Sequence, residues 1–125
     1  MGFFGNLFKG IRSATTHSFE RTMSARWEQI RTIYDVKKLE RMIAEKGLHD
    51  GTSKLCFIKI YKLRGYYAMS SSIRDAIYEA GVDKTTKEVI DPLLAFLKYD
   101  WFLNSSDSNI REIREILRDL KKDHQ

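Results

Sequence analysis

The residues best suited to acid–base chemistry lie together in the first half of the chain, where Glu45, His49 and Asp50 surround Gly47. A carboxylate beside an imidazole can orient the ring and hold it in one tautomer. A histidine positioned in this way can act as a general acid or base. Gly47 is also a typical helix-ending residue. A helix that ends there would not place Glu45 and His49 on one face. The pattern therefore favours a solvent-exposed loop over a catalytic pair.

Histidine and cysteine are too scattered in the sequence to predict a metal site. His17, His49 and His124 lie in different segments, and none has a second histidine or a cysteine nearby. Zinc sites use Cys and His ligands at short characteristic spacings, and di-iron bundles use Glu-x-x-His motifs, which do not occur. Glycine-rich phosphate loops and the G-x-S-x-G motif are also absent. We therefore predict no catalytic residue, no metal and no cofactor.

The single cysteine, Cys56, precludes an intramolecular disulfide and favours a reducing compartment, so we expect a cytoplasmic protein. Its neighbours Leu55 and Phe57 are apolar. This setting is typical of a cysteine buried as a small hydrophobic residue rather than of a nucleophile.

The N-terminal segment, residues 1–13, is a candidate binding surface. Its apolar residues recur at the spacing of one helix face, with cations opposite, and the candidate partner- or membrane-binding residues are Phe3, Phe4, Leu7, Phe8, Lys9, Ile11 and Arg12. The composition resembles that of cationic amphipathic peptides, which lie in a membrane interface. We expect this segment to pack on the protein's own core, with a partner protein or a membrane surface as the alternatives.

The positive charge of the protein is concentrated in its first half. Residues 1–65 hold 13 Lys and Arg against 6 Asp and Glu, a net +7, whereas residues 66–125 hold 9 against 11, a net −2. Such an asymmetry indicates an anionic partner. The candidate residues for an anionic-partner face are Arg21, Arg26, Arg31, Lys37, Lys38 and Arg41. Acidic residues interrupt this series, so a solvated helix face is favoured over a nucleic-acid interface.

The apolar periodicity predicts an all-α fold, a compact bundle of about five to six helices, with 1–13 as an amphipathic N-terminal helix and 14–125 as a single helical domain. Residues 17–46 form one long predicted helix, or two if Asp35 caps a second one. For residues 55–69 a helix is favoured over a β-hairpin turning at Arg64–Gly65. In that helix Lys54, Lys59 and Lys62 would group away from the apolar face.

Capping residues predict where the other helices begin and end. Thr52 or Ser53, then Ser71 or Ser72, are expected as N-caps, and Gly81 is expected to follow a helix end. The capping box Thr85–Glu88 and the pair Asp91–Pro92 predict two further starts. The apolar segment 93–103 is expected in the core. The last helix should carry a narrow buried stripe of Ile110, Ile113, Leu117 and Leu120.

A foldable chain without a catalytic, metal or cofactor motif favours a non-catalytic helical protein that binds another protein, as an adaptor, inhibitor or immunity-type factor. The alternative is a peripheral membrane protein, still cytoplasmic, anchored by the N-terminal helix. A weaker alternative is nucleic-acid binding through the basic first half. The sequence leaves the oligomeric state open.

Overall fold

The computed structural model describes residues 12–125, with side chains from His17 onward. Its helices are α2 (Arg12–Ile30), α3 (Val36–Lys46), α4 (Gly51–Arg64), α5 (Tyr66–Ala80), α6 (Thr86–Leu94), the 3-10 helix η2 (Ala95–Lys98), α7 (Asp100–Asn104) and α8 (Ser108–His124). Residues 12–125 contain no strand. The predicted all-α bundle is confirmed, with seven α-helices in the described range instead of about five to six.

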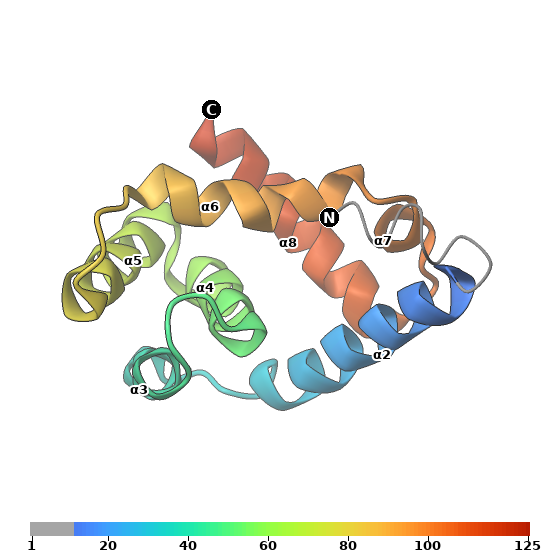
Figure 1. The fold of residues 1–125 in the computed structure, drawn as a ribbon, viewed down its shortest axis with the longest axis horizontal. Helices are drawn as coiled ribbons and strands as arrows, with labels where there is room; N and C mark the ends of the chain where they lie inside the picture. The colour runs from blue at the N-terminus through green and yellow to red at the C-terminus, as the bar shows by residue number, and fades with distance from the viewer. Residues whose placement is uncertain (1–11) are drawn as a thin grey trace.

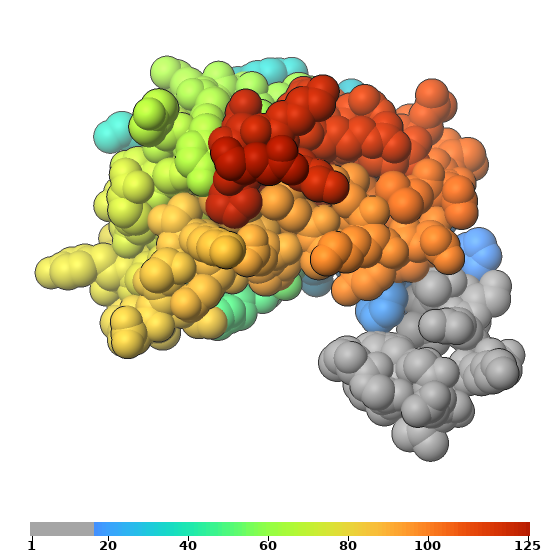
Figure 2. Space-filling model, turned by 90° about the horizontal axis from the view of Figure 1, so that it is seen from above, coloured from blue at the N-terminus to red at the C-terminus, as the bar shows by residue number. Residues whose placement is uncertain are grey.

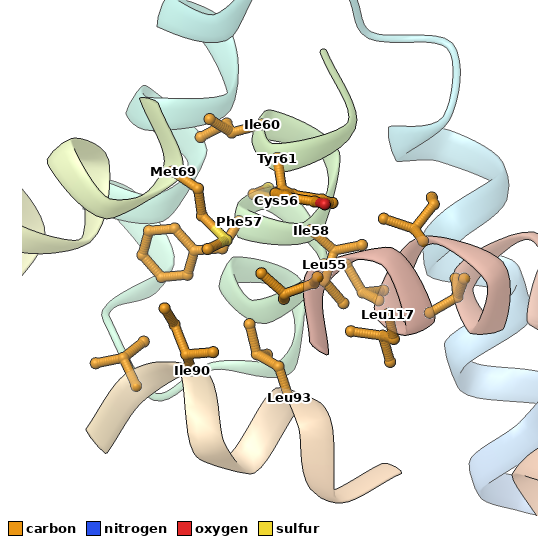
Figure 3. Close-up of a cluster of buried hydrophobic side chains, with 14 of the residues drawn as sticks. Leu55, Cys56, Phe57, Ile58, Ile60, Tyr61, Met69, Ile90, Leu93 and Leu117 are labelled. Carbon is orange, nitrogen blue, oxygen red and sulfur yellow. The ribbon is translucent and has the colours of Figure 1, made fainter. Parts of the chain in front are cut away.

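Helix α4 lies at the centre of the bundle and contacts α2, α3, α5 and α8 (Figure 1). Its residues from Leu55 to Tyr61 are all buried. Figure 3 shows Leu55, Phe57 and Ile58 on the side of α4 that faces Ile90 and Leu93 of α6 and Leu117 of α8. A helix that is covered on all sides has no polar face to leave in solvent. This position explains why its sequence lacks a clean amphipathic pattern.

Burial of Lys59 contradicts the expectation that the lysines of this segment lie away from the core. Its side chain is 2% exposed. Its ammonium group donates a 2.7 Å hydrogen bond to the carbonyl oxygen of Arg31, just beyond the end of α2. That carbonyl is one of the unsatisfied acceptors at a helix C-terminus, where the helix dipole also favours a cation.

The long segment 17–46 divides into two helices at the predicted point. Asp35 caps α3, and its carboxylate accepts a 3.0 Å hydrogen bond from the backbone N–H of Lys37. Gly47 ends α3 with φ of 94°, a conformation that favours glycine. Residues 55–69 are helical, as predicted, but they belong to two helices, α4 and α5, that meet at Gly65. The β-branched and aromatic residues of this segment are accommodated because α4 is buried.

Three capping predictions are wrong. Asp50, not Thr52 or Ser53, caps α4 by accepting a 2.8 Å hydrogen bond from the N–H of Thr52. Helix α5 begins at Tyr66, so Ser71 and Ser72 lie inside it. Helix α6 continues through Pro92 instead of restarting there. Burial of Val89, Ile90 and Leu93 on α6, each contributing roughly 1.5–3 kcal/mol, compensates for the proline.

The predicted helix ends at Gly81 and Thr85 and the stripe of α8 agree with the structure, whereas the apolar segment 93–103 is only partly in the core. Thr85 caps α6 and Gly81 ends α5 in the left-handed region. The stripe of α8 is buried at Ile110, Ile113, Leu117 and Leu120. In the apolar segment 93–103, Leu93 and Phe102 are fully buried, but the other apolar residues are only partly buried and Leu103 is exposed, because the short helices η2 and α7 lie at the surface of the bundle. Within the described residues, no helix combines the length and the hydropathy that crossing a bilayer requires.

Candidate functional site

A groove of about 580 Å³ lies between α3 and α5, the two helices that flank α4 (Figure 1). Its floor is made of apolar or small residues from the two helices and the turn after α3, namely Ile43, Ala44, Gly47, Leu48, Ala76 and Ala80. Small side chains allow another backbone to approach both helices closely. We call this feature the α3–α5 groove.

One hydrogen bond between the two helices marks a fixed point along the α3–α5 groove. Ser72 of α5 donates to the Oε2 atom of Glu40 of α3 at 2.8 Å. Most other lining residues lie after this pair on both helices, as far as Leu48 and Ala80. The two helices therefore run in the same direction along the groove. On α5 the eight-residue spacing from Ser72 to Ala80 corresponds to about 12 Å, or roughly two turns.

The two rims of the α3–α5 groove carry opposite charge. Lys37 and Arg41 line it on α3, and Asp75 and Glu79 line it on α5. All four side chains are exposed. Within residues 17–125 none of them forms a hydrogen bond or ion pair through its side chain. The four charges are therefore available to an external partner.

The predicted anionic-partner face does not form one surface. Arg21, Arg26 and Arg31 follow one another at five-residue intervals on and just after α2, so they point in directions about 140° apart. Arg31 pairs with Glu112 at 3.3 Å. The guanidinium of Arg26 lies against Gly51, at a point where a Cβ atom would collide with it.

The other three residues of the predicted basic face, Lys37, Lys38 and Arg41, lie on α3, and all three are exposed. Lys37 and Arg41 border the α3–α5 groove, and Lys38 does not line it. Anion binding by the six residues stays a prediction.

The predicted N-terminal binding residues Phe3, Phe4, Leu7, Phe8, Lys9 and Ile11 lie outside the described residues. Arg12 is the first residue of α2, and its side chain is also outside the described set. Partner or membrane binding by this segment stays a prediction.

His124 has partners that the sequence did not reveal. Its Nδ1 atom lies 2.8 Å from the hydroxyl of Tyr66, and its Nε2 atom lies 3.5 Å from a carboxylate oxygen of Asp91. Next to it on α8, Asp123 accepts a 2.5 Å hydrogen bond from Tyr61, whose pKa is raised by burial and by this carboxylate. These contacts join the end of α8 to α4, α5 and α6, as Figure 2 illustrates for α6. The arrangement fastens the C-terminal turn of α8 and does not border the α3–α5 groove.

His49, Asp50 and Cys56, which the sequence offered as candidates for chemistry, do not form a catalytic arrangement with one another in the structure. His49 is exposed, and Asp50 serves as a helix cap. The backbone N–H of Thr52 lowers the pKa of Asp50, and the charges of Arg26 and Lys46 add to this effect. Cys56 is fully buried, as predicted, and burial raises the pKa of its thiol to about 12. Among the described residues, no three His, Cys, Asp or Glu side chains gather as a metal site would require.

Comparisons with protein-family models, curated proteins and solved structures give no significant match for this chain. The α3–α5 groove was not predicted from the sequence, because Asp75, Glu79 and the alanines were not singled out. Two signals were present in the sequence. Lys37–Arg41 and Asp75–Glu79 are like-charge pairs four residues apart, and Ala44 follows three residues after Arg41 and Ala76 directly after Asp75.

Proposed function

We propose that this chain is a non-catalytic helical protein that acts by binding another protein, and that the α3–α5 groove is the binding surface. The observation that carries the proposal is a floor of small and apolar residues, crossed at one point by the Glu40–Ser72 hydrogen bond, between two rims of opposite, unpaired charge. Such a protein would serve its partner as an adaptor, an inhibitor or an immunity-type factor.

Both the floor and the rims of the α3–α5 groove favour binding of a partner. Exposed apolar area on the floor contributes to affinity when a partner covers it, at about 25 cal/mol per Å². Charged rims contribute orientation and association rate more than affinity. On each rim two like charges lie four residues apart on one helix, a spacing that destabilises a helix by roughly 0.2–0.5 kcal/mol per pair. A partner with opposite charges would relieve this repulsion.

The test is site-specific photo-crosslinking in the cells that produce the protein. A photoreactive amino acid replaces Ala44, which lines the groove, or Ala25, an exposed alanine of α2 outside it. We expect a discrete protein adduct from position 44 that is absent from position 25 and is lost when Arg41→Glu is added. Equal adducts from both positions, or none from position 44, would contradict the proposal.

A further inference from the structure

We propose that the partner segment is an amphipathic α-helix with acidic residues along one edge of its apolar stripe and basic residues along the other. This inference rests on the proposed function, because it names the kind of segment that the α3–α5 groove receives.

The walls favour a helix over an extended strand. Both are α-helices whose backbone N–H and C=O groups are paired within the helix, so they offer a bound strand little backbone hydrogen bonding. Strand addition requires an exposed sheet edge, and residues 12–125 contain no strand. A helix satisfies its own backbone and presents only side chains to the groove. It would lie on α3 and α5, on the side opposite α4.

The floor is suited to the apolar stripe of such a helix. Ala44, Ala76 and Ala80 are small and at least partly exposed, so they supply most of the apolar surface that a partner can cover. Ile43 and Leu48 lie beneath it, at 3% and 6% exposed. The distance from the Glu40–Ser72 hydrogen bond to Ala80 at the end of α5 accommodates about two helical turns. Three or four apolar residues spaced three and four apart would cover it.

The rims determine what lies on either side of that stripe. The α3 rim carries Lys37 and Arg41, so it attracts acidic side chains, and the α5 rim carries Asp75 and Glu79, so it attracts basic ones. Like charges placed opposite each other at an interface are costly, which excludes helices with two acidic or two basic edges. The bound helix therefore has one edge of each sign. Turning the bound helix end for end would exchange its two edges between the rims. The charges of its edges therefore determine the direction in which the helix lies along the groove.

A displayed library of helical peptides of about 16 residues, a length of about four turns, tests this inference. Its stripe positions vary among Ala, Leu, Ile and Met, and its two edges vary independently among Glu, Lys and Ser. The target is the full chain. We expect the enriched peptides to combine an acidic edge with a basic edge, and to bind at least tenfold more weakly to Ala44→Arg but equally well to Ala25→Arg.

Reversing one rim gives the decisive comparison. When the target carries Lys37→Glu with Arg41→Glu, both rims are acidic, and we expect the enriched peptides to have two basic edges. When it carries Asp75→Lys with Glu79→Lys, both rims are basic, and we expect two acidic edges. All four positions are exposed and unpaired within residues 17–125, and the second pair of substitutions repeats the test independently of the first.

The failures of the two proposals are distinguishable. Peptides whose affinity depends on Ala44 but whose edge charges do not follow the rims would overturn the inference and leave the proposed function standing. No enrichment, or enriched peptides that bind Ala44→Arg as well as the unmodified protein, would overturn both.

Discussion

The indole N–H of Trp27 donates a 2.6 Å hydrogen bond to the Oε1 atom of Glu112, a residue of α8 that lies 85 positions later in the sequence. Trp27 is fully buried in the core. The same carboxylate accepts from Lys62 of α4 at 2.6 Å and from Arg31 at 3.3 Å. A single side chain therefore links α2, α4 and α8. The link also satisfies the polar atom of the largest core residue, which would otherwise be costly to bury.

Glu112→Gln should lower the free energy of unfolding by about 2 kcal/mol at neutral pH, because charge-assisted hydrogen bonds are replaced by neutral ones. Burial raises the pKa of Glu112, but hydrogen bonds from Lys62, Trp27 and Arg31 outweigh burial and lower the pKa from 4.5 to about 2. A carboxyl whose pKa is lower in the folded state stabilises the protein above its unfolded pKa. That stabilisation is lost as the pH falls from 4.5 towards about 2.

Urea denaturation across this pH range measures the effect of Glu112→Gln. The difference in stability between the wild type and the variant should shrink steadily as the pH falls. Glu115→Gln is the matched control, because Glu115 is exposed on the same helix and, among the side chains of residues 17–125, pairs only with Arg118. It should cost about 0.5 kcal/mol or less. A difference for Glu112→Gln that does not depend on pH would refute the assigned role of its charge.

Lys59→Met should lower the free energy of unfolding by about 1–2 kcal/mol, because the carbonyl of Arg31 loses its hydrogen bond. The variant also loses the contact between the ammonium of Lys59 and the ring of Tyr34, whose centroid lies 4.5 Å away. Burial lowers the pKa of Lys59, and the neighbouring charge of Lys62 adds to this shift.

The control for Lys59→Met is Lys54→Met on the same helix, since the ammonium of Lys54 has no partner within residues 17–125. Chemical denaturation of the two variants gives the comparison. If Lys59→Met is as stable as Lys54→Met, then apolar burial of the methionine offsets the lost hydrogen bond, and Lys59 is not needed to cap α2.

The thiol of Cys56 should resist alkylation by iodoacetamide at pH 8 while the protein is folded. It is fully buried, and burial raises its pKa to about 12, with a further contribution from the charge of Asp50. The thiolate, which is the reactive form, is therefore scarce as well as inaccessible. Mass spectrometry should show modification only at the rate of unfolding and rapid modification in denaturant. Modification of the folded protein at the rate of a free cysteine would contradict this expectation.

Arg41→Glu and Ala44→Arg should each change the free energy of unfolding by about 0.5 kcal/mol or less. Both positions are exposed, and within residues 17–125 Arg41 has no bonded or ion-pair partner to lose. Arg41→Glu also removes the repulsion between Arg41 and Lys37. Thermal unfolding measures the stability of the two variants, with Ala25→Arg, a substitution outside the groove, as the control. A large loss of stability in either would mean that the groove residues serve the fold, and binding defects could not then be assigned to the groove.

Local signals in the sequence were sufficient for most helix ends and for the apolar stripe of α8. Asp35, Gly47, Gly81 and Thr85 act through hydrogen bonds or backbone angles within a few residues of themselves, so they can be identified without knowing the fold. The same approach failed at Pro92 and Asp50. At Pro92, burial of one face of α6 outweighed the local rule. At the start of α4, Asp50 caps the helix two residues before Thr52 and three before Ser53, so both predicted caps lie inside the helix.

The sequence by itself determined that this protein is all-α, because helical periodicity and capping depend on neighbours three or four residues apart. Only the tertiary structure decided that α4 is central, that Lys59 is buried and that Glu112 joins three helices. Only the tertiary structure placed the rim of Lys37 and Arg41 opposite the rim of Asp75 and Glu79. These relationships connect residues that are 28 to 85 positions apart, as in the Lys59–Arg31 and Trp27–Glu112 bonds. Which helix packs beside which is fixed by burial of apolar surface across the whole chain, and no local pattern encodes that choice.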